Sequence, residues 1–282
     1  MLRNKIHPEG EIKGAQSTAV GSLRFLVPVD FTDRSYNALG YTLQLAKMCN
    51  GSIELFPMAE DIPLPQSESP LTLRHALTAG ESKMNRKIES LKEIIKDNGV
   101  EVTCGDIQHG AIAAALTDQL SVTRPDVVVV GGGTTSGVFA RVATEAKTAL
   151  LVVPPTLQIT VPRKVLLLRD EDAVREESLR PLFSIVHNGS KQLRVVGKKK
   201  GSFTKLIFKY LLPVEEFEVG VNRSFDVQST LTDDVDAFLQ KEKPDMICRL
   251  VRPPSFWQRI AWPWRDATLS NRVDVPTLFI TD

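Results

Sequence analysis

The sequence of 282 residues has little of what marks several classes of protein. It has only three cysteines, Cys49, Cys104 and Cys248, with no Cys-x-x-Cys pair, so they cannot all pair. They suit a reducing compartment, with each expected as a small core residue. No apolar run approaches the roughly 18 residues that cross a bilayer. Residues 1–22 lack the apolar centre of a secretory signal. We therefore expect a cytoplasmic protein with no membrane partner.

The chain also lacks an excess of charge of one sign. It has 35 Lys and Arg residues and 34 Asp and Glu residues, a formal net charge of +1. A dedicated nucleic-acid binder usually carries a basic footprint, so no nucleic-acid partner is expected. Gly-x-Ser-x-Gly, His-Glu-x-x-His and Walker A sequences are missing as well. These absences favour a globular protein that is not an enzyme, although they do not decide the point.

What the chain does contain is an internal repeat. Phe-Leu-Val-Pro-Val-Asp at 25–30 and Val-Leu-Leu-Leu-Arg-Asp at 165–170 are apolar runs that end in a carboxylate. Arg-Pro-Asp at 124–126 and Lys-Pro-Asp at 243–245 each precede another apolar run. The repeat predicts two similar domains, and the expected organisation is a flexible tail at 1–22, a first domain at 23–155, a linker at 156–163 and a second domain at 164–282.

Short apolar runs alternate with helical patterns in both halves. In the first half, strands are expected at 24–29, 52–57, 100–104, 127–130 and 150–153. Gly51 is expected to end the first helix, and 61–80, with three prolines, is expected to be a long loop. The second half repeats the order less cleanly. The predicted fold class is α/β, with two similar doubly wound domains that each contain a five-stranded, mainly parallel sheet.

The opening of the first half, Phe-Leu-Val-Pro-Val-Asp-Phe-Thr-Asp at 25–33 followed by Ser35 and Ala38-Leu39, resembles universal stress protein domains. The glycines after the fourth strand and the Ala-Arg-Val within residues 138–153 resemble the close of that domain. The whole chain is therefore similar to a tandem universal stress protein. The resemblance implies an adenine nucleotide alpha hydrolase-like fold, a bacterial stress-response or regulatory role, and a homodimer or an internal pseudo-dimer.

The resemblance also implies a nucleotide site in the first half. Family members that bind ATP carry Gly-x-x-Gly, nine further residues and then Gly-Ser or Gly-Thr after the fourth strand. Asp30 would then face the ribose or a metal, and the backbone near Met58 would meet the adenine. Asp30 and Asp33 also admit a plainer interpretation, as a strand-end carboxylate and a helix cap. The candidate cofactor-binding residues are Pro28, Asp30, Met58, Val130, Gly131, Gly132, Gly133, Thr134, Thr135, Ser136, Gly137 and Val138, and no catalytic or metal-ligating residue is predicted.

The sequence departs from that pattern in both halves. Thr134 stands where the second glycine is expected, and Asp126 to Val153 spans 27 positions against 35 from Asp245 to Ile280. The first half therefore lacks about eight residues of the loop that would enclose a triphosphate. The corresponding loop of the second half has lost its glycines and carries two prolines without N–H groups and three tryptophans, Trp257, Trp262 and Trp264.

These departures lead to the functional expectation, a non-catalytic stress-response protein with weakened or lost ATP binding. Two alternatives stay open. The glycine turn of the first half could hold ATP, AMP, or a single phosphate or sulfate, with slow hydrolysis of ATP, or it could be only a tight strand-to-helix turn. The tryptophan-rich segment could instead bind a protein partner or assemble an oligomer.

Overall fold

The computed structural model describes part of the chain in detail, namely residues 21–59, 70–133, 136–155, 157, 159–169, 175, 177–189, 192–197, 216–220, 241–251 and 275–281. The tail at 1–20, the lysine-rich segment after residue 197 and the tryptophan-rich segment lie outside these residues.

Strands and helices alternate through the first half. The strands are β1 (Arg24–Val29), β2 (Ser52–Pro57), β3 (Glu101–Cys104), β4 (Val127–Gly131) and β5 (Ala149–Val153). The helices are α1 (Asp33–Cys49), α2 (Pro70–Asp97), α3 (Ile112–Thr123) and α4 (Ser136–Glu145). All five predicted strands of this half are confirmed to within one or two residues.

The described part of the second half contains the same order of strands. Its strands are β6 (Lys164–Arg169), β7 (Gln192–Gly197), β8 (Glu216–Gly220), β9 (Met246–Val251) and β10 (Thr277–Thr281). Between β6 and β7 lie a short 3₁₀ turn (Glu177–Leu179) and helix α5 (Arg180–Gly189). Residues 198–215 and 221–240, which link β7, β8 and β9, lie outside the described residues.

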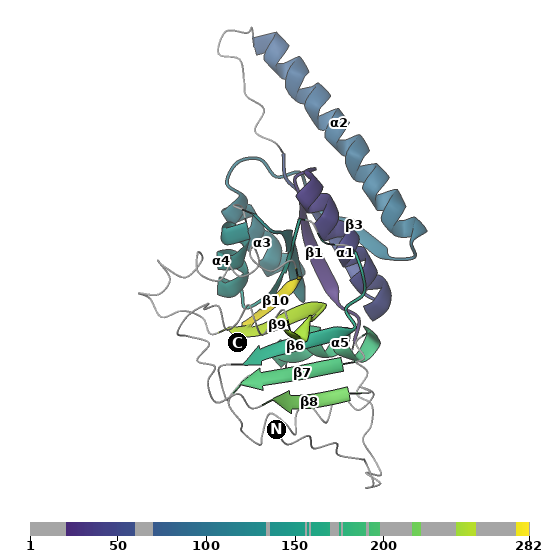
Figure 1. Cartoon of the computed structure of the whole chain (residues 1–282). Helices are drawn as coiled ribbons and strands as arrows, with labels where there is room; N and C mark the ends of the chain where they lie inside the picture. Colours follow the sequence, from purple (N-terminus) through teal and green to yellow (C-terminus); the bar gives the residue numbers. More distant parts are fainter. Residues whose placement is uncertain are drawn as a thin grey trace.

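All ten strands form one sheet, in the order β3-β2-β1-β4-β5-β10-β9-β6-β7-β8 (Figure 1). Every pairing is parallel except that of β5 with β10, which is antiparallel and joins Val152 to Thr277 and Leu150 to Phe279. Read outward from this junction, both halves show the same strand order. The α/β, mainly parallel architecture is confirmed, but the two expected five-stranded sheets are continuous because β5 and β10 pair edge to edge.

Alternation of side chains along the strands divides the core between the two faces of the sheet. Phe25 and Val27 of β1 pack with α1 and α5 on one face, whereas Leu26 packs with α3 and α4 on the other. Both faces of β1 are buried, which explains its unbroken apolar sequence.

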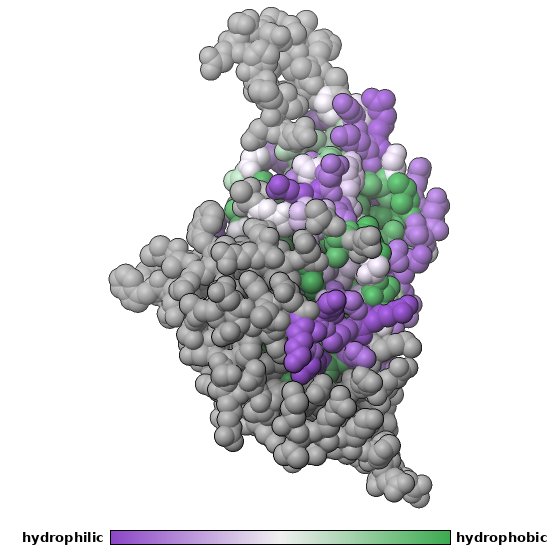
Figure 2. Space-filling view, viewed as in Figure 1, coloured by the Kyte–Doolittle hydropathy of each residue, from purple (hydrophilic) through white to green (hydrophobic). Residues whose placement is uncertain are grey.

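Helix α2 departs from the sequence-based expectation. It begins at Pro70, inside the stretch expected to be a loop, and continues to Asp97. Proline suits the first position of a helix, where its missing N–H costs nothing, and no glycine or proline interrupts the chain between Pro70 and Gly80. The helix reaches beyond the edge of the sheet (Figure 1), and hydrophilic residues cover the outer side of its described part (Figure 2).

The turn that precedes the fourth strand of each half is fastened to the first strand in the same way. Asp126 accepts a hydrogen bond from the Arg24 N–H at 2.8 Å, and its own N–H donates to the Arg24 carbonyl at 2.9 Å. Asp245 makes the same two bonds with Lys164, both at 2.9 Å. The recurring Arg-Pro-Asp and Lys-Pro-Asp sequences therefore occupy corresponding places in the two halves.

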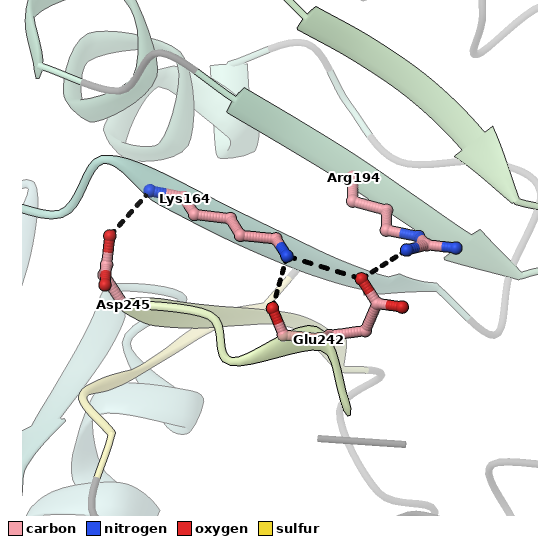
Figure 3. A network of polar contacts seen from close by, with 4 residues as sticks. All are labelled: Lys164, Arg194, Glu242 and Asp245. Atoms are coloured by element: carbon pink, nitrogen blue, oxygen red, sulfur yellow. Dashed lines mark hydrogen bonds and ion pairs between the residues drawn. The ribbon is translucent and has the colours of Figure 1, made fainter. Parts of the chain in front are cut away.

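The second half adds a charged cluster to this arrangement (Figure 3). Glu242 is 6% exposed and pairs with both Lys164, at 3.4 Å, and Arg194. The Lys164 ammonium also donates to the Glu242 carbonyl, as the Arg24 guanidinium donates to the Thr123 carbonyl at 2.9 Å in the first half. One buried carboxylate thus compensates two partly buried cations near the amino ends of β6 and β9.

We expect Glu242→Ala to lower the free energy of unfolding by about 3 kcal/mol, because it removes a buried carboxylate that pairs with two partly buried cations. Urea denaturation measures the change. The control is Glu89→Ala, which breaks a solvent-exposed pair with Lys92 on α2 and should leave the urea midpoint unchanged. Equal midpoints for the two variants would contradict the assignment.

Candidate functional site

A cavity of about 390 Å³ opens at the carboxyl ends of β1, β2 and β4. In a parallel α/β sheet this edge, where crossovers leave in opposite directions, is the usual place for a ligand. Seven predicted site residues line the cavity: Pro28, Asp30, Met58, Val130, Gly131, Gly132 and Gly133. The topology therefore gathers them from three strands, and their role in binding remains a prediction.

The structure does not bring every predicted residue to the cavity. Thr134 and Thr135 lie outside the described residues. Gly137 and Val138 lie in the first turn of α4 and are not part of the lining, and Ser136 is described only as the first residue of that helix.

Sequence reasoning missed five residues of the lining. Thr32, Asp33, Arg34 and Ser35 form the entry to α1, and Phe139 comes from α4. Asp33 was considered as a helix cap, whereas it is Thr32 that caps α1, by accepting a bond from the Ser35 N–H at 3.4 Å. Their position in the sequence could have indicated these residues, because the first turn of a helix that follows a parallel strand lies at the ligand-binding edge of the sheet.

Asp30 is held in place by the start of α1. Its Oδ1 accepts a bond from the Thr32 hydroxyl at 2.6 Å and another from the Thr32 N–H at 3.1 Å. Burial by itself would raise the pKa of Asp30, but hydrogen bonds from Thr32 and Ser35 outweigh it and hold the pKa below its usual value. The carboxylate is therefore ionised at neutral pH.

Phe31, between Asp30 and Thr32, has a left-handed backbone with φ of 61°. This conformation is unfavourable for an aromatic residue and is kept only where surrounding contacts impose it. The Phe31 ring packs edge-on against Tyr36, with 6.5 Å between centroids, and the Lys87 ammonium lies 4.9 Å from its centroid. These contacts fix the turn that presents Asp30 and Thr32 to the cavity.

Arg34 lies along the glycine turn that follows β4. A Cβ added to Gly131 would come within 2.6 Å of the Arg34 carbonyl oxygen, and one added to Gly133 would come within 2.4 Å of the Arg34 Nη1. Gly131 is therefore required by the approach of the α1 backbone, whereas Gly133 faces the end of a flexible side chain and is favoured by its own backbone φ of 153°. The N–H of Gly132 donates to the Val153 carbonyl at 2.8 Å, so it is engaged with β5.

The backbone at the end of β2 is likewise engaged. The Met58 N–H donates to the Val29 carbonyl at 2.9 Å, and the Ala59 N–H donates to the Gln108 carbonyl at 2.9 Å. Met58 is 6% exposed and forms a parallel bridge with Gln108. The apolar side of the cavity is thus rigid.

The cysteines largely follow the expectation of core residues. Cys49 and Cys248 are buried, whereas Cys104 is only partly buried. Burial raises the pKa of Cys49 to about 11 and also raises the pKa of Cys248, so both thiols stay protonated at neutral pH.

Within the ranges given above, no group of three His, Cys, Asp or Glu side chains is arranged to hold a metal ion. None of the helices in the described part of the chain is both long and apolar enough to cross a membrane.

We expect Asp30→Asn to lower the free energy of unfolding by about 1 kcal/mol at pH 6, through weaker hydrogen bonding. Because the folded pKa of Asp30 lies below its unfolded value of 3.8, the stabilisation is fully present above that value and is lost as the pH falls through the folded pKa. Denaturant unfolding between pH 6 and pH 2 should therefore show the difference between variant and parent shrinking below pH 3.8. A difference that does not vary with pH would contradict this assignment.

We expect Gly131→Ala to destabilise the protein by about 2 kcal/mol, because the new methyl group meets the Arg34 backbone rather than a flexible side chain. The matched control is Gly137→Ala, since nothing lies within 4 Å of a Cβ there and alanine favours a helix. Thermal unfolding should show a loss for the first variant and no loss for the second. Equal stability of both variants would rule out close packing of Arg34 on the turn.

Comparison with known proteins gives similarity in structure alone. No protein-family profile matches the sequence, and no curated protein matches it. A universal stress protein from Archaeoglobus fulgidus has 14% identity and a TM-score of 0.65, covering 93% of this chain and 97% of that one. A functionally unknown protein from Pseudomonas aeruginosa has 8% identity and a TM-score of 0.58, covering 94% of this chain and 95% of that one. The expected fold class is confirmed, and the chain has the fold of a universal stress protein.

Proposed function

We propose that this chain is a universal stress protein-like protein of the stress response that regulates by binding rather than by catalysis. The fold and the cavity at the carboxyl ends of β1, β2 and β4 support a binding role. On this proposal ATP binding is weakened or lost. The observation that carries it is the packing of Arg34 on the glycine turn.

A triphosphate needs a turn with space beside it and with N–H groups that point to the phosphates. At this turn, the Arg34 side chain takes the space next to Gly133, and the Gly132 N–H is bonded to Val153. The loop after β4 is also shorter than its counterpart in the second half by about eight residues. The residues present therefore fit a triphosphate poorly.

The sequence led us to expect either a homodimer or an internal pseudo-dimer, and the arrangement of the sheet supports the internal pseudo-dimer. The edge of β5 is covered by β10 of the same chain. Arg180 at the start of α5 also reaches across to the first half, where it pairs with Asp126 at 3.2 Å and donates to the Ser22 carbonyl at 2.8 Å. On this proposal the two domains, 23–155 and 164–282, correspond to the subunits of a dimer.

Isothermal titration calorimetry of the purified full-length protein with Mg-ATP tests the loss of ATP binding. We expect no heat of binding that fits a micromolar Kd, because the Arg34 side chain lies beside Gly133 where a phosphate would sit and the Gly132 N–H is already bonded to Val153. A micromolar Kd for ATP would overturn the proposed function.

A further inference from the structure

The cavity carries an unusual balance of charge for a site on a nucleotide-type scaffold. Its described lining contains a single cation, Arg34, and two carboxylates, Asp30 and Asp33. Like charges repel strongly where water is partly excluded. A ligand with several negative charges is therefore disfavoured, whereas a ligand with a single anionic group can place that group beside Arg34.

Arg34 is free to take part in such a contact. Its side chain is exposed, and its guanidinium makes no hydrogen bond or ion pair within the part of the chain that the structure describes. Its Nη1 lies close to Gly133 at the cavity wall. A guanidinium offers a planar fork of donors that matches two oxygens of a phosphate group.

The carboxylate side of the cavity suits a different chemical group of the same ligand. The ionised Asp30 has only acceptor oxygens, with Oδ1 already taken by the two bonds from Thr32. Such a group recognises hydroxyl donors on a ligand. The side chains of Met58 and Phe139, 6% and 3% exposed, form part of the apolar wall.

We infer that Arg34 is the anion-binding residue of this cavity, and that it selects a small phosphate monoester bearing hydroxyl groups over a polyphosphate. The inference rests on the proposed function, because it takes the triphosphate mode to be weakened or lost. The specificity comes from one guanidinium placed opposite two carboxylates in a cavity of about 390 Å³.

The test measures affinity by calorimetry for the full-length parent, Arg34→Ala, Arg34→Lys and a matched control, Arg86→Ala, whose side chain is exposed on α2 and donates to the Ser82 carbonyl of the same helix. The probes are AMP, ribose 5-phosphate, inorganic phosphate, adenosine and ATP. The two monoesters distinguish a nucleotide from a sugar phosphate as the source of the same chemistry. Circular dichroism melting of each variant without ligand verifies that it is folded.

We expect the parent to bind at least one monoester more tightly than phosphate, adenosine or ATP. Arg34→Ala should weaken that binding roughly ten- to 100-fold, the loss expected for a charge-assisted hydrogen bond. Arg34→Lys should retain part of the affinity, since it keeps the charge without the fork, and Arg86→Ala should bind like the parent.

Three results would overturn the inference. The first is that the parent binds neither monoester. The second is that the parent and a folded Arg34→Ala variant bind the monoester with equal affinity. The third is tight ATP binding that appears only in Arg34→Ala, which would mean that the Arg34 side chain blocks the site. The first two leave the proposed function standing. Micromolar ATP binding by the parent is the distinct result that removes the proposed function itself.

Discussion

The antiparallel pairing of β5 with β10 is the constraint on which the rest of the structure depends. It turns two parallel half-sheets into one sheet of ten strands, and it sets the two halves in opposite directions about their junction. An exposed strand edge invites pairing with another chain. Here each half covers the exposed edge of the other, and α1 packs against α5 beside the junction. A chain that lost this pairing would expose two apolar edges at once.

The site follows from the same parallel topology. Crossovers that leave β1 and β4 place the entry to α1 beside the glycine turn after β4, so Arg34 and Gly133 meet although almost 100 residues separate them. Gly131 therefore has a structural cause in the close approach of α1. The same approach places a guanidinium at the wall of a cavity in which the other charged groups of the described lining are carboxylates.

Local patterns were sufficient for most of the fold. Apolar runs of four to six residues located β1, β4 and β5, because strands buried on both faces need no polar alternation. The outer strands β2 and β3 instead alternate between buried and more exposed residues along part of their length. The helix boundaries were predicted less accurately. Asn50, rather than Gly51, takes the left-handed position at the end of α1, with φ of 49°, whereas Gly51 is required because a Cβ would lie 2.5 Å from the Leu23 carbonyl. The start of α2 was missed because three prolines at 63, 65 and 70 are typical of a loop, although the residues after Pro70 favour a helix.

The sequence by itself determined the alternation of strands and helices and the repeat, since both are patterns of residues close together in the chain. The seven predicted site residues, which run from Pro28 to Gly133, meet at one edge only because the parallel sheet brings three strand ends together. The tertiary structure alone decided that the two half-sheets join, that Arg34 lies over Gly133, and that Glu242 pairs with Lys164 and Arg194. These contacts join segments far apart along the chain, and no local preference of a residue specifies which distant atom it will meet.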